Sequence, residues 1–257
     1  MNAQTVFVGP VPRLAVSVAG QGSLVLFLHG IRGSRKNWLS QIEAFSKKFK
    51  AAAWDARGYG ESDDYEGLLQ FDQFSGDVLR VAEQFGAKKM HLVGLSMGSR
   101  IARNVALHFP ERLQSLTLVS TTPGFDALSA GEVRRFVTER KTSTPESLRR
   151  LLGSRARPGA FEELTESLSL LHEESYRKTL EASVAQDRGA PLENIRVPTL
   201  VIAGDEDTVY PPALAREVAR RIPGAELVML EDAGHLVNLE QPERFNAVLL
   251  KFLREHS

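Results

Sequence analysis

The sequence predicts an α/β fold in which a mostly parallel, eight-stranded sheet is flanked by helices and carries an inserted helical cap. Three observations lead to this class. Short apolar runs without polar alternation are typical of strands that are covered on both faces of a parallel sheet. These runs alternate with segments of helical periodicity, as in proteins with helices on both sides of one sheet. One long stretch near the middle of the chain shows helical periodicity only, which indicates an insertion.

Local patterns place each element of the first half of the chain. Strands are predicted at residues 5–8, 13–18, 24–28, 51–54, 92–95 and 115–119. Glycine and proline separate the first two strands, which predicts a hairpin, whereas the later ones are apolar throughout, which predicts burial. Apolar residues three and four positions apart predict helices over residues 37–48, 74–85 and 97–109. Pro110 ends the last of these helices.

The pattern changes after residue 122. From there to residue 189 the sequence shows amphipathic helical stretches and no convincing strand, so we predict a helical cap over residues 123–189. Pro191 and Pro198 bracket the return to strands. The remaining elements are predicted as strands at residues 199–203 and 226–230 and helices at residues 213–222 and 245–252. We therefore expect one core formed by residues 1–122 and 190–257.

The composition argues against several classes of function. Lysine plus arginine and aspartate plus glutamate both number 32 among 257 residues, so charge gives no reason to expect nucleic acid or a membrane as a partner. The chain has no cysteine, which excludes disulfides, thiolate metal sites and a cysteine nucleophile. No secretory signal, membrane-spanning run, phosphate loop or dinucleotide-binding motif is visible. We expect a cytoplasmic monomer or homodimer that uses no metal and no cofactor.

Residues 92–99 carry the motif with the clearest chemical meaning. An apolar strand breaks there at a Gly-x-Ser-x-Gly pentapeptide centred on Ser96 and continues as a helix. In a strand–turn–helix of this kind the serine hydroxyl is held clear of the backbone, and the two glycines remove side chains that would collide where strand and helix cross. Ser96 is therefore the candidate nucleophile.

A serine nucleophile needs a base within hydrogen-bond reach and an acid that orients the base. Of six histidines, His235 is the best candidate for the base, because it directly follows the last predicted strand. The strand ends of an open parallel sheet converge where ligands bind. His29 also lies beside this predicted site, and there we expect it to shape the loop after the third strand.

The acid should follow the preceding strand, where Asp205, Glu206 and Asp207 lie in one short loop. Either aspartate would give the chain order serine, aspartate, histidine, which is one of the three known arrangements of this triad. Spacing alone does not separate Asp205 from Asp207.

Two backbone N–H groups are candidates for an oxyanion hole. The N–H of Met97 lies at the start of a helix whose dipole favours negative charge, and the N–H of Ile31 lies in the loop after the third strand. Both would donate to the oxygen of the tetrahedral intermediate.

Five segments occur in a characteristic order: His29-Gly30, an Asp-x-Arg-Gly-x-Gly-x-Ser turn at residues 55–62, the pentapeptide of Ser96, a strand ending in Gly-x-x-Asp at residues 197–207, and Gly234-His235. Together they make the sequence resemble enzymes of the α/β-hydrolase fold over essentially its whole length. The resemblance implies that Asp207 is the acid and that the turn at residues 55–62 is structural.

Within that fold, the pentapeptide, the short helical cap and the chain length are most similar to 3-oxoadipate enol-lactonases and related small esterases. The resemblance implies a serine hydrolase that cleaves a carboxylic ester or a lactone through an acyl-enzyme, with an enol-lactone or another small carboxylated ester among the candidate substrates. Three alternatives stay open: a C–C bond hydrolase, a cofactor-free haloperoxidase or perhydrolase, and a ligand-binding signalling receptor with vestigial hydrolysis.

A substrate with a free carboxylate would need a cation in the site. Arg32 directly follows Ile31 in the predicted oxyanion loop. We predict that Arg32 binds the substrate carboxylate, whereas most arginines of the cap cover solvated helix faces.

Overall fold

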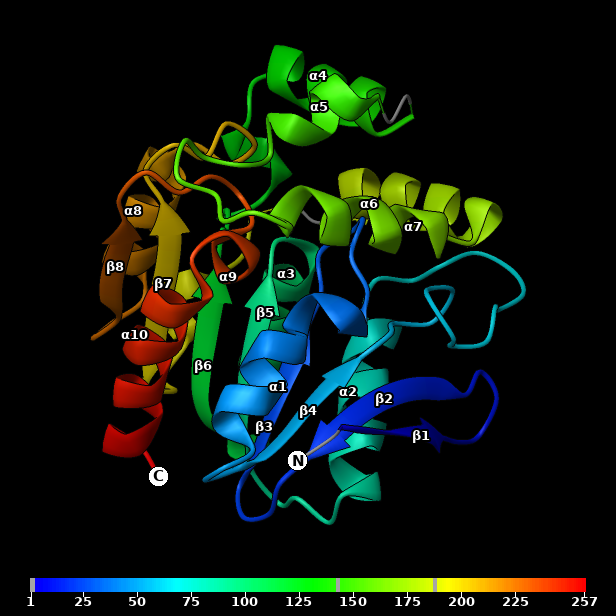
Figure 1. The fold of residues 1–257 in the computed structure, drawn as a ribbon, viewed down its shortest axis with the longest axis vertical. Coiled ribbons are helices and arrows are strands. Elements are labelled where there is room, and N and C mark those ends of the chain that lie inside the picture. Colours follow the sequence, from blue (N-terminus) through cyan, green and yellow to red (C-terminus); the bar gives the residue numbers. More distant parts are fainter. Residues whose placement is uncertain (1–2, 142–143, 187–188) are drawn as a thin grey trace.

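The computed structural model describes residues 3–141, 144–186 and 189–257. Within these residues, eight strands form one sheet in the order β1-β2-β4-β3-β5-β6-β7-β8 (Figure 1). The strands are β1 (Gln4–Val8), β2 (Leu14–Ala19), β3 (Leu24–Leu28), β4 (Lys50–Trp54), β5 (Met90–Leu95), β6 (Leu113–Val119), β7 (Thr199–Gly204) and β8 (Glu226–Leu230). The first two strands pair in antiparallel fashion and β3 to β8 pair in parallel, which confirms the predicted fold class.

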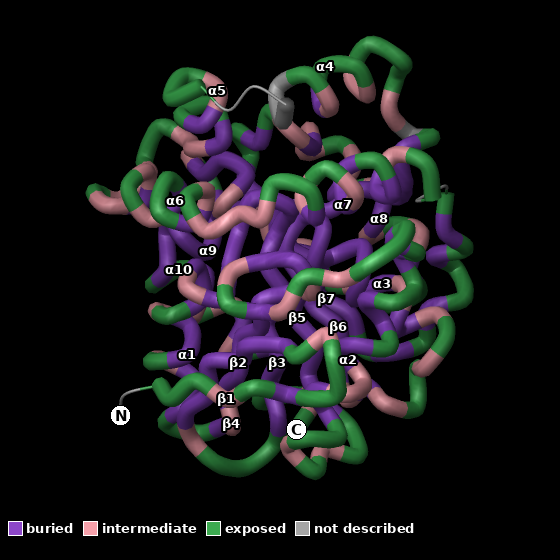
Figure 2. Tube along the Cα trace, turned by 90° about the vertical axis from the view of Figure 1, so that its right-hand side faces the viewer, coloured by how far each residue is buried: buried purple, intermediate pink, exposed green. Residues whose placement is uncertain are grey.

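Helices cover both faces of this sheet. The α-helices of the described residues are α1 (Leu39–Phe45), α2 (Gln73–Gln84), α3 (Met97–His108), α4 (Ala130–Lys141), α5 (Pro145–Arg149), α6 (Ala160–Ser169), α7 (Glu173–Gln186), α8 (Pro212–Arg221), α9 (Val237–Glu240) and α10 (Pro242–Glu255). Side chains alternate across a strand, so Leu26 belongs to the core under α2, α3 and α8, and its neighbour Phe27 to the core under α1 and α10. Figure 2 shows the central strands buried between these layers.

The helices α4 to α7 lie between β6 and β7 in the chain and sit above the carboxyl ends of the strands (Figure 1). The part of residues 123–189 that the structure describes contains no named strand, as the sequence pattern indicated. An isolated bridge between Tyr59 and Leu171 joins this region to the loop after β4. We propose that residues 123–189 act as a cap on a core formed by residues 1–122 and 190–257.

The helix expected at residues 37–48 has different bounds in the structure. It starts as a 3-10 turn, Arg35–Trp38, continues as α1 and ends at Phe45. Ser34 and Asn37 form a capping box that fixes this earlier start, and the N–H of Ser34 donates to Asn37 Oδ1 at 2.9 Å. In the part of the chain that the structure describes, no helix is both long and apolar enough to span a membrane.

His91 in β5 provides a pH-dependent contribution to stability. Its Nδ1 lies 2.7 Å from Ser115 Oγ, and burial lowers the pKa of His91 from 6.5 to about 4. The unfolded chain therefore binds more protons than the folded chain between these two values, so the folded state loses stability as the pH falls through this window. We expect a loss from this residue of up to about 3 kcal/mol.

Urea unfolding of the wild type and of His91→Gln at several pH values from 6.5 to 4 measures this contribution. The free energy of unfolding of His91→Gln should fall less steeply with decreasing pH. Equal slopes for the two proteins would contradict the assignment.

Candidate active site

Ser96 lies in the sharp turn between β5 and α3, in a strained backbone conformation. Its φ of 54° and ψ of −110° are unusual for a residue with a side chain. The surrounding backbone maintains this conformation: the N–H of Ser96 donates to Val119 O at 2.9 Å, and Ser96 O accepts from the N–H of Ser99 at 3.0 Å. The turn therefore presents the Ser96 hydroxyl at the carboxyl end of the sheet.

The two glycines of the pentapeptide are required by close backbone contacts. A Cβ atom on Gly94 would lie 2.1 Å from Gly98 O, and one on Gly98 would lie 2.3 Å from Leu28 O. Any larger residue would force α3 away from β3 and β5 and would move Ser96.

His235 and Asp207 form a buried hydrogen-bonded pair. The Nδ1 atom of His235 lies 2.8 Å from Asp207 Oδ2, and each residue is only 3% exposed. The other carboxylate oxygen, Oδ1, accepts the N–H groups of Val209 at 2.8 Å and Tyr210 at 2.9 Å. A carboxylate at Nδ1 favours the tautomer whose proton is on Nδ1, which leaves Nε2 as a proton acceptor. Of the two aspartates that spacing could not separate, Asp207 is the one that contacts His235, and Asp205 is exposed.

The backbone of His235 is fixed as well as its ring. Its N–H donates to Leu151 O at 2.8 Å, and its carbonyl oxygen accepts the Ser120 hydroxyl at 2.8 Å. The ring of Tyr210 meets the imidazole edge to face, with centroids 5.4 Å apart. These contacts come from the cap, from the loop after β6 and from the loop after β7.

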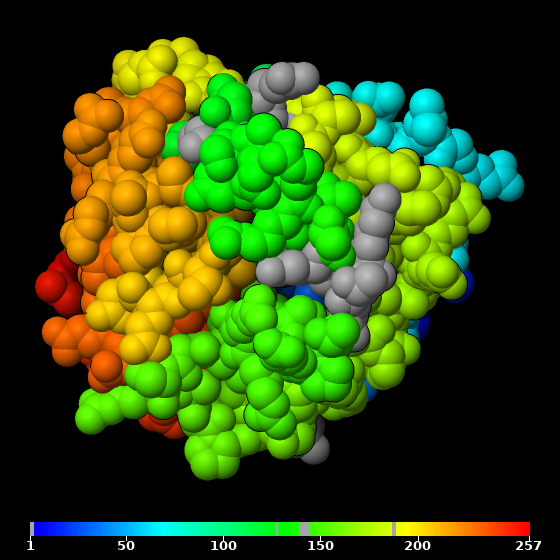
Figure 3. All heavy atoms as spheres, turned by 90° about the horizontal axis from the view of Figure 1, so that it is seen from above, coloured from blue at the N-terminus to red at the C-terminus, as the bar shows by residue number. Residues whose placement is uncertain are grey.

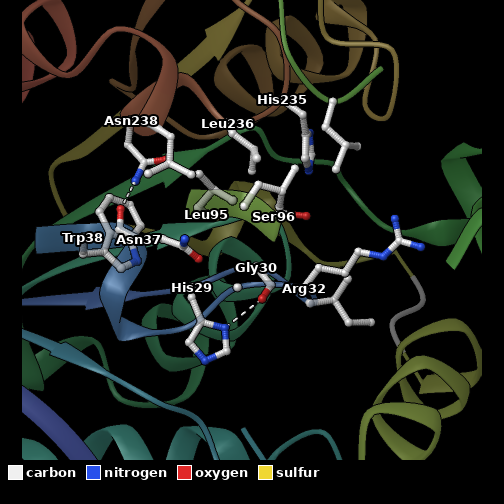
Figure 4. Close-up of a pocket in the computed structure, with 15 residues that line it drawn as sticks. His29, Gly30, Arg32, Asn37, Trp38, Leu95, Ser96, His235, Leu236 and Asn238 are labelled. Atoms are coloured by element: carbon white, nitrogen blue, oxygen red, sulfur yellow. Dashed lines mark hydrogen bonds between the residues drawn. The ribbon is translucent and has the colours of Figure 1, made fainter. Parts of the chain in front are cut away.

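One pocket brings together Ser96, His235, Ile31 and Arg32 (Figure 4). Its other walls are mostly apolar and include Trp38, Leu95, Leu151, Leu164, Leu236 and Leu239. The cavity volume is about 30 Å³. One water molecule occupies roughly 10–15 Å³, so this pocket accommodates small groups. Seen from the cap side, an opening between cap segments exposes atoms of the N-terminal part of the chain, drawn in blue (Figure 3).

Both predicted oxyanion residues lie beside Ser96. Met97 is the first residue of α3, so its N–H has no acceptor within the helix and lies at the positive end of the helix dipole. Ile31 lines the pocket from the loop after β3 and is 4% exposed. The structure thus places the two residues on the two backbone segments that meet at Ser96.

His29 shapes the loop that carries Ile31, as we expected from the sequence. Its Nε2 accepts the N–H of Ala56 at 3.0 Å, and its Nδ1 donates to Gly30 O at 2.7 Å. Burial lowers the pKa of His29 below its ordinary value, so the ring stays neutral. Both ring nitrogens are therefore engaged in holding backbone.

Arg32 is a buried cation in the pocket wall, with 5% of its surface exposed. Its Nε donates to the hydroxyl of Tyr176 in α7 at 3.3 Å. Figure 4 shows Arg32 and Trp38 on opposite sides of Ser96. The pocket thus has the Arg32 cation on one side of Ser96 and Trp38, with Asn37 and Asn238, on the other.

The turn at residues 55–62 is built from ion pairs and backbone hydrogen bonds. Asp55 forms a buried ion pair with Arg35 and accepts the N–H of Glu61 at 3.0 Å. Arg57 donates twice to Asp77, at 2.6 and 2.7 Å. These side chains support the loops beneath the pocket, which agrees with the structural role that the sequence resemblance implied.

Sequence reasoning missed two buried polar residues that follow His235. The Nδ2 atom of Asn238 donates to Asn37 O at 2.9 Å, and the carboxylate of Glu240 accepts three backbone N–H groups. Each is 1% exposed. Their one sequence signal is that they are polar residues within an otherwise apolar stretch, at residues 236–240. Among the residues that the structure describes, no group of three or more His, Asp or Glu side chains could hold a metal ion.

Comparisons with known proteins agree on one family. The profile of a family described as "alpha/beta hydrolase fold" matches residues 23–242. The dihydrolipoyllysine-residue acetyltransferase component of the acetoin cleaving system from Cupriavidus necator is 30% identical over 246 residues, and the match covers 91% of this chain but only 64% of that protein. The 3-oxoadipate enol-lactonase 2 of Acinetobacter baylyi is 28% identical over 240 residues, and the match covers 89% of each chain. A solved structure of a thermophilic, malate-bound esterase from Thermogutta terrifontis is 28% identical, with a TM-score of 0.84 and coverage of 99% and 100% of the two chains.

Proposed function

Because this chain belongs to the alpha/beta hydrolase fold family, we propose that it is a serine hydrolase that cleaves a carboxylic ester or a lactone. The observation that carries this proposal is the hydrogen bond between His235 and Asp207, with His235 lining the same pocket as the strained Ser96. A general base with an oriented ring next to a serine at a strand–helix turn is the arrangement that acyl transfer requires.

The proposed reaction has two halves. Ser96 Oγ attacks the carbonyl carbon while His235 Nε2 takes the hydroxyl proton, and Asp207 stabilises the imidazolium that forms. The N–H groups of Ile31 and Met97 donate to the oxyanion of the tetrahedral intermediate. His235 then gives its proton to the leaving alkoxide, and an acyl-enzyme remains on Ser96. In the second half His235 deprotonates a water molecule that attacks the acyl carbon. The bond between that carbon and Ser96 Oγ then breaks, His235 returns the proton to Oγ, and the acid product leaves.

We place the substrate among small esters or lactones that carry a carboxylate. Arg32 supplies a buried cation at one end of the pocket, and the small cavity favours a short acyl group. The names of two similar proteins, a 3-oxoadipate enol-lactonase and a malate-bound esterase, support this substrate class. The first name contains 3-oxoadipate and the second contains malate, and both compounds are carboxylic acids.

Replacement of Arg32 tests the substrate class. Arg32→Ala should raise KM for a half-ester of a dicarboxylic acid by about 10-fold or more, because a hydrogen bond to a charged group contributes roughly 1.5–3 kcal/mol. The KM for a neutral ester of the same length should stay within about 2-fold. Steady-state kinetics on the two esters measure the effect. Arg177→Ala is a matched control, because Arg177 lies on α7 next to Tyr176 but is exposed and pairs with Glu181. Equal changes in KM for both esters would rule out a carboxylate contact.

A turnover assay separates the proposed hydrolase from two of the alternatives, the receptor and the perhydrolase. Sustained multiple turnover of p-nitrophenyl acetate or butyrate supports an esterase. A burst of about one p-nitrophenol per chain, followed by almost no further release, would instead indicate a ligand-binding receptor. Oxidation that depends on halide and peroxide would indicate perhydrolase chemistry at the same serine.

A further inference from the structure

The carboxylate of Glu240 accepts hydrogen bonds from the backbone on both sides of His235. Glu240 is 1% exposed, and its Oε2 accepts the N–H of Gly234 at 2.8 Å while its Oε1 accepts the N–H of Leu236 at 2.8 Å. The same Oε2 accepts the N–H of Gly153, in the cap, at 2.6 Å. One side chain therefore fixes the two residues that flank His235 and ties them to the cap.

The cap segment of residues 150–157 also holds the residues that flank Asp207. Ser154 donates to the Glu206 carboxylate through its N–H at 2.6 Å and its hydroxyl at 2.8 Å. The hydroxyl of Thr208 donates to Arg150 O at 3.0 Å. The neighbours of both members of the His235–Asp207 pair are thus bound to one short segment of the cap.

This segment packs directly on the His235 loop through glycine. A Cβ atom on Gly153 would lie 2.5 Å from the Gly234 nitrogen and 2.6 Å from Asp232 O. His235 itself donates its N–H to Leu151 O at 2.8 Å. The two backbones are in contact, so a displacement of the cap segment would be transmitted to His235.

Charge strengthens this contact. Burial raises the pKa of the Glu240 carboxyl above its ordinary value, and the N–H groups of Gly234, Gly153 and Leu236, together with His235, oppose that rise. An ionised carboxylate accepts stronger hydrogen bonds than a neutral group, so the three contacts favour a single geometry of the loop.

We propose that Glu240 is a positioning residue through which the docked cap segment, residues 150–157, holds His235 in line with Asp207 and Ser96. Its effect on turnover rests on the proposed hydrolase function. Its effect on the geometry of His235 does not, because the hydrogen bond between His235 and Asp207 exists without substrate.

Proton NMR tests the geometry directly. An imidazole N–H that is strongly hydrogen-bonded to a carboxylate gives a resonance far downfield of the backbone amides, and we expect one for His235 Nδ1–H in the wild type. In Glu240→Gln this resonance should broaden or disappear, because a carboxamide has one acceptor oxygen and places an NH₂ group against backbone N–H donors. Glu243→Gln is the matched control, since Glu243 is exposed and lies three residues further along the chain.

Ester kinetics on the same proteins give the functional readout. Glu240→Gln should lower kcat by about 10- to 100-fold with little change in KM, because small displacements of a catalytic group cost rates of this size while substrate contacts are kept. Gly153→Ala approaches the same contact from the cap and leaves the Glu240 carboxylate in place. Gly153→Ala should lower kcat in the same way. Thermal unfolding shows whether each variant folds, and Gly153→Ala keeps the proposal testable if Glu240→Gln does not fold.

A folded Glu240→Gln with the wild-type downfield resonance and wild-type kcat would overturn the proposal. Wild-type behaviour of Gly153→Ala would overturn the role of the cap. A third outcome separates the two proposals. If Glu240→Gln loses the resonance and the wild type shows no ester turnover, the positioning role is supported and the hydrolase function is rejected.

Discussion

Ser96→Ala should lower kcat/KM for a p-nitrophenyl ester by at least about 10³-fold without unfolding the protein. The substitution removes the atom that forms the acyl-enzyme, and in well-studied serine hydrolases only the residual contribution of the oxyanion hole and substrate binding remains. The strained φ of 54° at residue 96 is imposed by the turn and is as accessible to alanine as to serine, so the fold should persist.

Steady-state kinetics measure the loss of kcat/KM, and thermal unfolding shows whether the variant keeps its fold. Ser169→Ala serves as a control, because Ser169 ends α6 in the cap and is exposed. A Ser96→Ala protein with wild-type turnover would place the nucleophile elsewhere.

Asp207→Asn should lower kcat by about 10³- to 10⁴-fold. An amide at this position can donate to Nδ1 of His235, which favours the tautomer whose proton is on Nε2 and blocks that atom as a base. The N–H groups of Val209 and Tyr210 would still find an oxygen acceptor, so the loop should keep its shape.

Asp205→Asn is the matched control for Asp207→Asn. It changes the same charge two residues away, but Asp205 is exposed and its N–H donates to Leu230 O outside the pair. We expect kcat of Asp205→Asn within about 2-fold of the wild type. A larger loss in Asp205→Asn than in Asp207→Asn would reverse the assignment of the acid.

Patterns along the chain predicted the sheet and the positions of Ser96 and His235. Buried parallel strands are apolar throughout, and β3 was predicted residue for residue because burial on both faces leaves no alternation. Ser96 and His235 follow the ends of β5 and β8, so the topology alone brings them to one edge of the sheet. Asp207 was less clear, because two aspartates follow β7 and only the resemblance and then the hydrogen bond to His235 separate them.

Contacts between distant segments could not be predicted in this way. The hydrogen bond from Gly153 to Glu240 joins residues 87 positions apart, and that from Arg32 to Tyr176 joins residues 144 positions apart. Periodicity shows which face of a helix is buried but not which loop it meets. Contacts of this kind between the cap and the pocket therefore depend on packing that only the structure shows.

The most direct test of the central claim is the covalent trapping of Ser96. A p-nitrophenyl phosphonate ester should form an Oγ–phosphorus bond at Ser96 and release p-nitrophenol, and His235 would take the serine proton. We expect one equivalent of p-nitrophenol per chain and, by mass spectrometry of proteolytic peptides, a single phosphonyl group on Ser96. Sustained ester turnover with no adduct, or with the adduct on another residue, would contradict the account.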